Sequence, residues 1–295
     1  MDAIILEAAH DYIFPAVIFV VMFGLGLALN LSMIRKILVR PRALITGLGG
    51  QLLYLPLVAF AIAILGPWAG LVALGLVVIA VCPGGSTSNA IVFAIRGDIA
   101  LSVSLTAFSS VLTLVTIPVL LGLALQFWGV GEKEIELPIA TILKNLALMT
   151  ALPVALGMIM RQSIPALADR LIEPLRKVSL FLILMIIAIS IYNTRSYITA
   201  EIVQIAAASL ILALLVIGGG LMLGKVAGLS LSQQLAITIE VGVQNTPLAI
   251  YLGASLLNTP ELTVIAICYG LINYALIGGL ILFVRRFHLV EEAAR

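Results

Sequence analysis

The sequence predicts an all-α polytopic membrane protein, with about nine transmembrane helices in a single transmembrane domain over residues 1–295. Three observations predict this class. Hydrophobic residues make up 62% of the chain, charged residues make up 10%, and the mean hydropathy is +1.24, whereas soluble domains are close to half apolar and a quarter charged. Long apolar segments follow one another along the chain. Two of these segments carry proline, glycine and polar side chains near their centres.

Nine apolar segments are long enough to cross a bilayer, which takes about 20 residues. They lie roughly at 12–31, 43–65, 70–95, 99–127, 138–160, 177–193, 201–224, 231–256 and 261–284. The stretch before the first segment holds acidic residues and no basic one, so a signal or transit peptide is not expected. Cys82 and Cys268 both lie in apolar segments, which argues against a disulfide framework and against a metal cluster.

The basic residues predict the orientation of the chain in the membrane. Loops on one side carry most of them: Arg35, Lys36, Arg40, Arg42, Arg96, Arg161, Arg170, Arg176, Lys177, Lys225, Arg285, Arg286 and Arg295. The other side carries Lys133 and Arg195, and Lys144 is expected to reach the surface from the start of the fifth span. We therefore expect a multi-pass protein of the cell membrane. The positive-inside rule places its N-terminus outside the cell and its C-terminus in the cytoplasm, which requires an odd number of spans.

The third and eighth spans are each interrupted near the middle. The third contains CPGGSTSN from Cys82 to Asn89, and the eighth contains EVGVQN from Glu240 to Asn245, followed by Pro247. Their prolines and glycines do not sustain a straight helix, and unwound backbone at bilayer depth is tolerated only where protein buries it or a cavity borders it. One such segment alone could be a proline kink. Two of them, each beside side chains able to bind ions, indicate the binding site of a secondary transporter.

The spans around the two interruptions correspond to each other. In spans two to four and again in spans seven to nine, a full helix is followed by a broken helix and then by a helix that begins near an acidic residue, Asp98 or Glu261. The first span corresponds to the sixth, and the fifth has no counterpart. This pattern predicts an inverted-repeat transporter fold of five plus five helices that lacks its first helix.

Glu240 is the one acidic residue that the sequence places well inside a span. Burying a charged side chain there costs about 2.5–3.5 kcal/mol on insertion scales. Two interpretations follow: a protonated, hydrogen-bonded structural glutamate, or an ionised carboxylate that a bound cation neutralises. No basic residue nearby in sequence offers a counter-ion, which favours the bound cation.

The fourth span adds hydroxyl groups at helical spacing, and five of them form one stripe: Ser102, Thr106, Ser109, Thr113 and Thr116. The last three are expected to bond to their own helix and pack as small residues. Ser102 and Thr106 are nearest in sequence to the first interruption and are expected to face Ser88 and Asn89. Hydroxyl, amide and carboxylate oxygens together form a hard-oxygen shell that suits Na⁺.

Three separate blocks, CPGGSTSN, GDIALSVSLT and EVGVQN, resemble the bile acid:sodium symporter family in their order and spacing. The resemblance covers roughly Tyr12 to Phe287. It implies a core domain that holds two crossed discontinuous helices, about 43–127 and 201–284, and a panel domain that rocks against it, about 12–31 and 138–193. It also implies nine helices, as in the mammalian bile-acid carriers, whereas bacterial members usually have ten.

The resemblance further implies two sodium sites, with Na⁺ as the coupling ion and no other metal or cofactor. The first would use Ser88, Asn89, Ser102, Thr106 and Glu240, and the second would use Gln51, Glu240, Gln244 and the backbone carbonyls of Val241 and Val243. From the residues alone, Gln51 is an isolated amide in apolar sequence that would join neighbouring helices. The polar His–Asn pair of many bacterial relatives corresponds here to Ile272 and Asn273, which leaves the substrate open.

An anionic substrate is expected where the two interruptions meet. The second half of each broken helix, starting near Ser88 and near Asn245, would direct free N–H groups and a positive dipole end at a cavity. No basic residue in the membrane core is expected to bind the anion directly. We therefore expect an organic monoanion in a cavity walled by Leu, Ile and Val and bound by Ser86, Thr87, Asn245 and Asn273.

These features predict a sodium-coupled symporter that transports an organic anion, bile-acid-like or a small monocarboxylate such as pantoate, by alternating access. The alternative is a proton-coupled or uncoupled organic-anion carrier of the same fold, with Glu240 as the proton site. A channel would need repeated filter or charged-ring elements, and the two histidines, His10 and His288, lie at the chain ends, so neither a channel nor an enzyme is expected. The expected partners are the organic anion, sodium ions and the lipid bilayer, with no nucleic acid.

Overall fold

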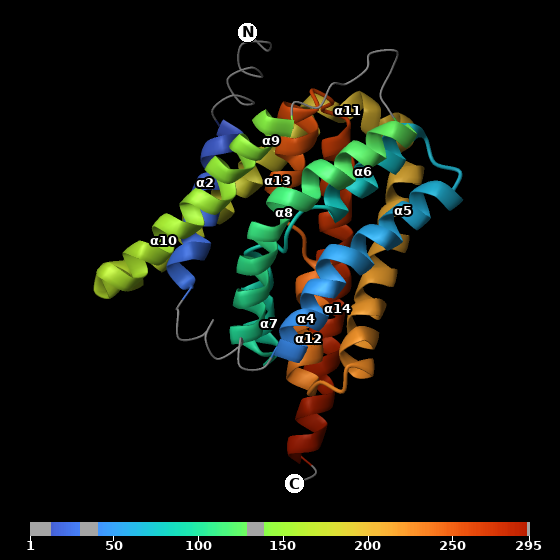
Figure 1. Cartoon of the computed structure of the whole chain (residues 1–295). Helices are drawn as coiled ribbons and strands as arrows, with labels where there is room; N and C mark the ends of the chain where they lie inside the picture. The colour runs from blue at the N-terminus through green and yellow to red at the C-terminus, as the bar shows by residue number, and fades with distance from the viewer. Residues whose placement is uncertain (1–12, 30–40, 129–138, 294–295) are drawn as a thin grey trace.

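The computed structural model describes residues 13–29, 41–128 and 139–293 (Figure 1). Within these residues the chain is helical, apart from short connections and one isolated β-bridge between Gly84 and Gln244. Part of the sequence evidence for orientation and class lies outside the described residues, namely the acidic N-terminal stretch, His10, Arg35, Lys36, Arg40, Lys133 and Arg295.

The described helices follow the predicted spans in order. They are α2 (Phe14–Ala28), α4 (Pro41–Gly49), η2 (Gly50–Tyr54), α5 (Leu55–Leu65), α6 (Gly70–Ala80), α7 (Thr87–Ala94), α8 (Ile99–Trp128), α9 (Ile139–Leu146), η3 (Ala147–Ala151), α10 (Leu152–Ser163), α11 (Pro165–Val226), α12 (Leu231–Gly242), α13 (Thr246–Tyr251), η4 (Leu252–Leu256) and α14 (Leu262–Ala293). The elements η2, η3 and η4 are single π-helical turns. Pro56 follows η2 and Pro153 follows η3, so the wider turn lies where proline removes a backbone donor.

Six segments of the described chain are long and apolar enough to cross a bilayer: Pro41–Leu65, Ile99–Trp128, Ile142–Ser163, Pro165–Arg195, Glu201–Val226 and Leu262–Phe283. The first predicted span is shorter, with 15 helical residues in α2. The third and eighth are short because each is two half-helices, of 11 and 8 residues in α6 and α7, and of 12 and 6 in α12 and α13. The chain is therefore an all-helical, multi-pass membrane protein, while the count of nine spans and the inverted repeat stay predictions.

A single helix, α11, covers both the sixth and the seventh predicted spans. The two spans remain separate apolar segments, Pro165–Arg195 and Glu201–Val226, but the interruption of the helical backbone expected between residues 193 and 201 is wrong. No proline or glycine lies between Asn193 and Glu201, and the backbone hydrogen bonds continue through this stretch. A straight helix of 62 residues would be about 93 Å long, three times the hydrocarbon thickness of about 30 Å. The two apolar segments of α11 therefore cannot cross one bilayer along a single straight axis, and Figure 1 shows the later one descending at the right of the view.

The same helix begins earlier than the hydropathy pattern predicts, at Pro165 and not near residue 177. The polar stretch RQSIPALADRLIEPLRK was expected to be a loop, but α10 continues to Ser163 and α11 begins at Pro165. Proline is favourable in the first turn of a helix, where its missing N–H has no partner to lose. As a result, Arg176 and Lys177 stand on a helix and not in a loop.

Two glycines bring α2 and α10 into close contact. A Cβ added at Gly26 would overlap the carbonyl of Val154 and lie 3.0 Å from the Cα of Gly157, and one added at Gly157 would meet the backbone of α2 in the same way. Small residues of this kind let two membrane helices approach closely. The helix α2 also lies against α11, so α2, α10 and the first part of α11 form one packed group.

The two broken helices form the centre of the molecule. Every residue in 72–85 and in 235–254 is buried, and α8, α11 and α14 surround these segments. Figure 1 shows α7, α12 and α4 close together, below the level of α6 and α13. The backbone of both interruptions is therefore enclosed by apolar helices, as unwound backbone inside a membrane needs to be, while Ser86, Thr87 and Asn89 are partly buried.

Candidate functional site

The interruptions of the two broken helices contact each other through their backbones. The amide of Gly85 donates to the carbonyl of Val243 at 2.8 Å, and the amide of Asn245 donates to the carbonyl of Pro83 at 3.0 Å. These two bonds satisfy backbone groups that the broken helices leave free. The close approach also explains a glycine, because a Cβ added at Gly84 would overlap the carboxylate of Glu240.

Glu240 lies at this crossing and is completely buried. Its Oε2 accepts hydrogen bonds from Ser88 Oγ at 2.7 Å and from Ser102 Oγ at 3.1 Å, and its Oε1 accepts one from Thr106 Oγ1 at 2.5 Å. Ser102 Oγ also lies 2.8 Å from Asn89 Oδ1. The structure thus brings together all five residues expected in the first sodium site, from α7, α8 and α12; we call them the Glu240 cluster.

The surroundings of Glu240 are polar but carry no opposite charge. Among the described residues, the groups that contact its carboxylate are hydroxyls, and no lysine or arginine is among them. Two hydroxyls further along the α8 stripe, those of Ser109 and Thr113, do not join the cluster. Ser109 and Thr113 bond to carbonyls of their own helix, at 3.1 and 3.2 Å, which confirms the expectation that these two hydroxyls bond locally.

The residues expected in a second sodium site lie directly beside this cluster. Gln51, on the π-helical turn η2, donates to Cys82 O at 2.9 Å and to Gln244 Oε1 at 2.8 Å. Gln244 in turn donates to Val241 O at 2.7 Å, and Val243 O already accepts from Gly85. Because a carbonyl oxygen has two lone pairs, these oxygens can hold a hydrogen bond and still coordinate a cation. Gln51 therefore ties the second span to both interruptions.

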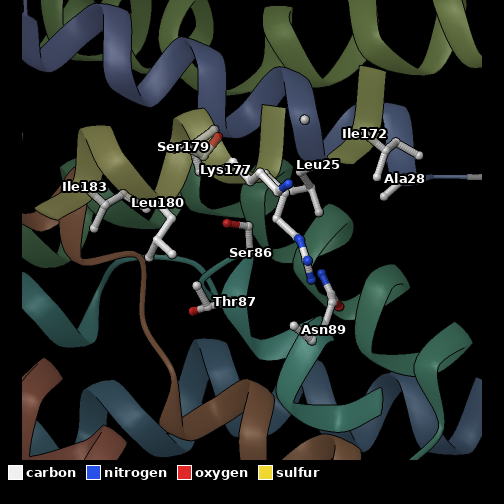
Figure 2. A pocket seen from close by; sticks show the side chains of 14 residues that line it. Leu25, Ala28, Ser86, Thr87, Asn89, Ile172, Lys177, Ser179, Leu180 and Ile183 are labelled. Atoms are coloured by element: carbon white, nitrogen blue, oxygen red, sulfur yellow. The ribbon is translucent and has the colours of Figure 1, made fainter. Parts of the chain in front are cut away.

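A cavity of about 510 Å³ opens beside the first interruption, between α2, α7 and α11. Ser86 and Thr87, which the sequence assigns to the substrate, line it, and so does Asn89. Figure 2 shows these three on one side of the space, with Lys177, Leu180 and Ile183 of α11 on the other. The full lining consists of Val21, Gly24, Leu25, Ala28, Ser86, Thr87, Asn89, Ala90, Ile172, Arg176, Lys177, Ser179, Leu180 and Ile183. We call this cavity the α2–α7–α11 pocket.

The other two residues expected to bind substrate do not line this pocket. Asn245 is the N-cap of α13, where its Oδ1 accepts from the Leu248 amide at 3.1 Å. Asn273 and Tyr269 both donate to the carbonyl of Gly242. Asn245 Nδ2 and Asn273 Oδ1 are buried without a hydrogen-bond partner. The structure therefore places Asn245 in the second interruption and Asn273, on α14, against it, and neither residue lines the pocket.

Sequence reasoning missed four residues that shape the site. Tyr269 holds the end of α12, and Tyr274 bonds to Thr87 with 2.7 Å between the two hydroxyl oxygens. Tyr269 and Asn273 are four residues apart on α14, a spacing that puts them on one helix face and could have drawn attention to them. Arg176 and Lys177 line the pocket, whereas the sequence counted them only as loop charges and expected no basic residue at the substrate.

Comparison with known proteins gives consistent matches. Residues 15–201 match the profile described as "Sodium Bile acid symporter family". Similar proteins include "Probable sodium/metabolite cotransporter BASS1, chloroplastic" of Arabidopsis thaliana, 26% identical over 88% of this chain and 64% of that protein. "Uncharacterized sodium-dependent transporter YocS" of Bacillus subtilis is 28% identical over 78% and 70% of the two chains. "Ileal sodium/bile acid cotransporter" of Homo sapiens is 26% identical over 83% and 69%.

Proposed function

Because this chain belongs to the sodium bile acid symporter family, we propose that it is a sodium-coupled symporter that moves an organic anion across a cell membrane by alternating access. The relatives are named as sodium/metabolite, sodium-dependent and sodium/bile acid transporters, which supports sodium-dependent transport at the level of the family. The observation that carries the proposal is the Glu240 cluster.

A fully buried carboxylate is costly unless something compensates its charge. In the Glu240 cluster three hydroxyl oxygens lie within hydrogen-bonding distance of it, and such hydroxyls can donate to an ionised carboxylate, which only accepts. Ser88, Ser102, Thr106 and Asn89 add neutral oxygens within one shell, and hard oxygen ligands of this kind suit Na⁺. We assign the first sodium ion to this shell. Because these hydroxyls can also accept from a protonated glutamate, the choice of Na⁺ over a proton rests on the sodium-dependent transporters among the relatives.

A second sodium ion would bind on the other side of Glu240, between Gln51, Gln244 and the carbonyls of Val241 and Val243. The hydrogen bonds among these groups hold their oxygens close together. On binding, the cation would take over the contacts that the two amides now make with each other. Glu240 is then the one charged ligand near both ions, which predicts that its removal weakens both sites.

The substrate is assigned to the α2–α7–α11 pocket, where Ser86 and Thr87 supply hydroxyls. Asn89 links the pocket to the ions, because it lines the pocket and its Oδ1 contacts Ser102 in the Glu240 cluster. A bound Na⁺ would fix Asn89 and so complete the pocket, which gives a physical route for coupling. Asn245 and Asn273 would reach the substrate only in a conformation that opens the second interruption.

The orientation and the domain division belong to the same proposal. The C-terminus and the basic ends of α10 and α11 would lie in the cytoplasm, so the α2–α7–α11 pocket, with Arg176 and Lys177 in its lining, would open to the inside. The group formed by α2, α10 and the first part of α11 would be the panel, and the broken helices with α8 and α14 would be the core. Nothing in this assignment calls for an enzymatic reaction.

The test is Na⁺-dependent stabilisation and transport by the purified protein. Na⁺ should raise the melting temperature relative to K⁺, by the linkage of a ligand that binds only the folded state. Glu240→Gln should abolish this rise, and Ser102→Ala should reduce it. Ser104→Ala is the matched control, because this buried hydroxyl of α8 bonds only to Ala100 O. In liposomes, anion uptake should follow an imposed Na⁺ gradient and not a pH gradient; the opposite dependence would favour the proton-coupled carrier.

A further inference from the structure

We propose that Arg176 and Lys177 recognise the acidic group of the transported anion at the mouth of the α2–α7–α11 pocket, so that they, and not the helix ends alone, select an anion. The inference rests on the proposed function and adds to it the orientation of the substrate in the pocket. It assigns the acidic group to α11 and the rest of the molecule to the apolar wall and the polar floor of the pocket.

Helical geometry explains why these two basic residues face the pocket. Its lining on α11 includes Ile172, Arg176, Leu180 and Ile183, which recur every three to four residues and therefore share one face of the helix. Lys177 stands beside this stripe, and Figure 2 shows its side chain extending along the pocket toward Leu25 of α2. Had this stretch been a loop, as the hydropathy pattern suggested, no such alignment would be expected.

The charges around the pocket leave a net positive field. Arg176 pairs with Glu173 at 2.8 Å, in a contact exposed to solvent, so this guanidinium is partly compensated. Lys177 is in neither of the two ion pairs found among the described residues. No aspartate or glutamate lines the pocket, and the carboxylate of Glu240 is completely buried beyond Ser88. One uncompensated ammonium group at the mouth fits a single negative charge on the substrate.

The remaining surface defines the rest of the substrate. Beside the basic residues, Leu180 and Ile183 of α11 and Val21 and Leu25 of α2 give the pocket an aliphatic wall. The floor carries Ser86, Thr87 and Asn89, which can bond hydroxyl or carbonyl groups. The volume of about 510 Å³ falls within the usual range for small-molecule sites, about 300–1,000 Å³. The pocket therefore suits an amphipathic organic monoanion with an acidic group at one end and hydroxyl or keto groups at the other.

The experiment compares charged and neutral forms of the same molecule. Dissociation constants of cholate and its methyl ester, and of pantoate and its lactone, are measured for the protein in phosphatidylcholine nanodiscs at saturating Na⁺ and fixed ionic strength. Lys177→Gln should weaken binding of the acid about fivefold, the upper end for a solvent-exposed ion pair, and leave the neutral form unchanged. The double variant with Arg176→Gln should lose more, and Lys177→Arg should retain the affinity.

Arg170→Gln is the control, because Arg170 lies on the same helix and is exposed but does not line the pocket. Equal loss of the acid and the neutral form in Lys177→Gln would overturn the inference, since the lysine would then act on packing. The inference would also be overturned if Lys177→Gln bound the acid as the wild type does and changed stability only in nanodiscs that contain phosphatidylglycerol. That result would assign Lys177 to a lipid phosphate. Wild-type binding of the acid that is lost in Lys177→Gln but independent of Na⁺ would support this inference and reject sodium coupling. Wild-type protein that binds none of the four probes would reject the substrate class.

Discussion

The two interruptions have similar compositions and contact each other through the same pair of backbone hydrogen bonds, yet their surroundings differ. In the first, Ser86, Thr87 and Asn89 are only partly buried and line the α2–α7–α11 pocket. In the second, Gln244 and Asn245 are buried, with 4% and 2% of their surface exposed. Similar sequence features therefore have different surroundings: the first interruption borders the pocket to which we assign the substrate, and the second is buried at the crossing.

The difference comes from what covers each interruption. The carbonyl at the end of α12, that of Gly242, accepts from both Tyr269 and Asn273 of α14, and the side chain of Asn245 caps α13. The first interruption has less cover: Ser86 precedes α7 without a side-chain cap, and Tyr274 reaches Thr87 from the side. Backbone groups satisfied by buried side chains resist movement. We therefore expect substitutions in the second interruption to cost stability and those in the first to cost binding.

The largest effect is expected where the two interruptions depend on each other, at Gly84. Gly84→Ala should destabilise the protein by about 3 kcal/mol, the upper end for overpacking, because its Cβ would overlap the carboxylate of Glu240. The Na⁺-dependent rise in melting temperature should disappear as well. Chemical unfolding in detergent measures the first effect. Gly24→Ala is the control, since that position has open space around it; equal stability of the two variants would contradict the packing described for the crossing.

The next effect tests the cover of the second interruption. Tyr269→Phe combined with Asn273→Ala removes both donors from the Gly242 carbonyl and leaves it buried. The expected loss is about 2 kcal/mol of unfolding free energy, within the usual cost of an unsatisfied buried group. The affinity for an organic anion should change less than stability does, because neither residue lines the pocket. A variant of wild-type stability with impaired anion binding would instead assign these residues to the substrate.

Sequence reasoning went furthest where chemistry is dense in a short segment. Proline and glycine predicted both interruptions, and the charge of Glu240 inside apolar sequence singled out a residue that the structure surrounds with Ser88, Ser102 and Thr106. Helical spacing placed the hydroxyls of α8 on one stripe, and closeness in sequence to the first interruption was enough to choose Ser102 and Thr106 over Ser109 and Thr113. All of these signals are local, so they survive without knowledge of the packing.

The pocket could not be predicted in the same way. Its lining joins α2, α7 and α11, which are far apart in the sequence, and its basic residues lie in a polar stretch that hydropathy assigns to a loop. The difference in burial between the two interruptions could not be predicted from the sequence either. It depends on Tyr269, which the sequence did not single out, and on Asn273, which the sequence assigned to the substrate; both donate to the carbonyl of Gly242 once α14 is placed against α12. The similar half-helix starts of the two interruptions therefore suggested that Asn245 faces the substrate as Ser86 and Thr87 were expected to.

A smaller effect is expected for the link between ions and substrate. Asn89→Ala removes the side chain that both lines the pocket and contacts Ser102. In the wild type, saturating Na⁺ should strengthen anion binding by about 1–3 kcal/mol, the usual range for coupled sites; in the variant this difference should approach zero. Calorimetry with cholate at low and saturating Na⁺ measures it. Ser86→Ala also alters the pocket, but among the described residues the Ser86 side chain makes no hydrogen bond to the cluster, so this variant should bind the anion more weakly and preserve the coupling.

The smallest effect distinguishes two roles of the Thr87 hydroxyl: contact with the substrate and the hydrogen bond to Tyr274. Thr87 lines the pocket and bonds to Tyr274 at 2.7 Å, so its hydroxyl has two possible uses. Thr87→Val keeps the shape of the side chain and should weaken cholate and its methyl ester alike, by about threefold, the cost of one neutral hydrogen bond. Tyr274→Phe breaks the same bond without touching the lining and should leave both affinities near wild type. If both substitutions weaken binding equally, the hydroxyl of Thr87 serves to hold α7 against α14. In that case the first interruption would resemble the second more than its exposure suggests.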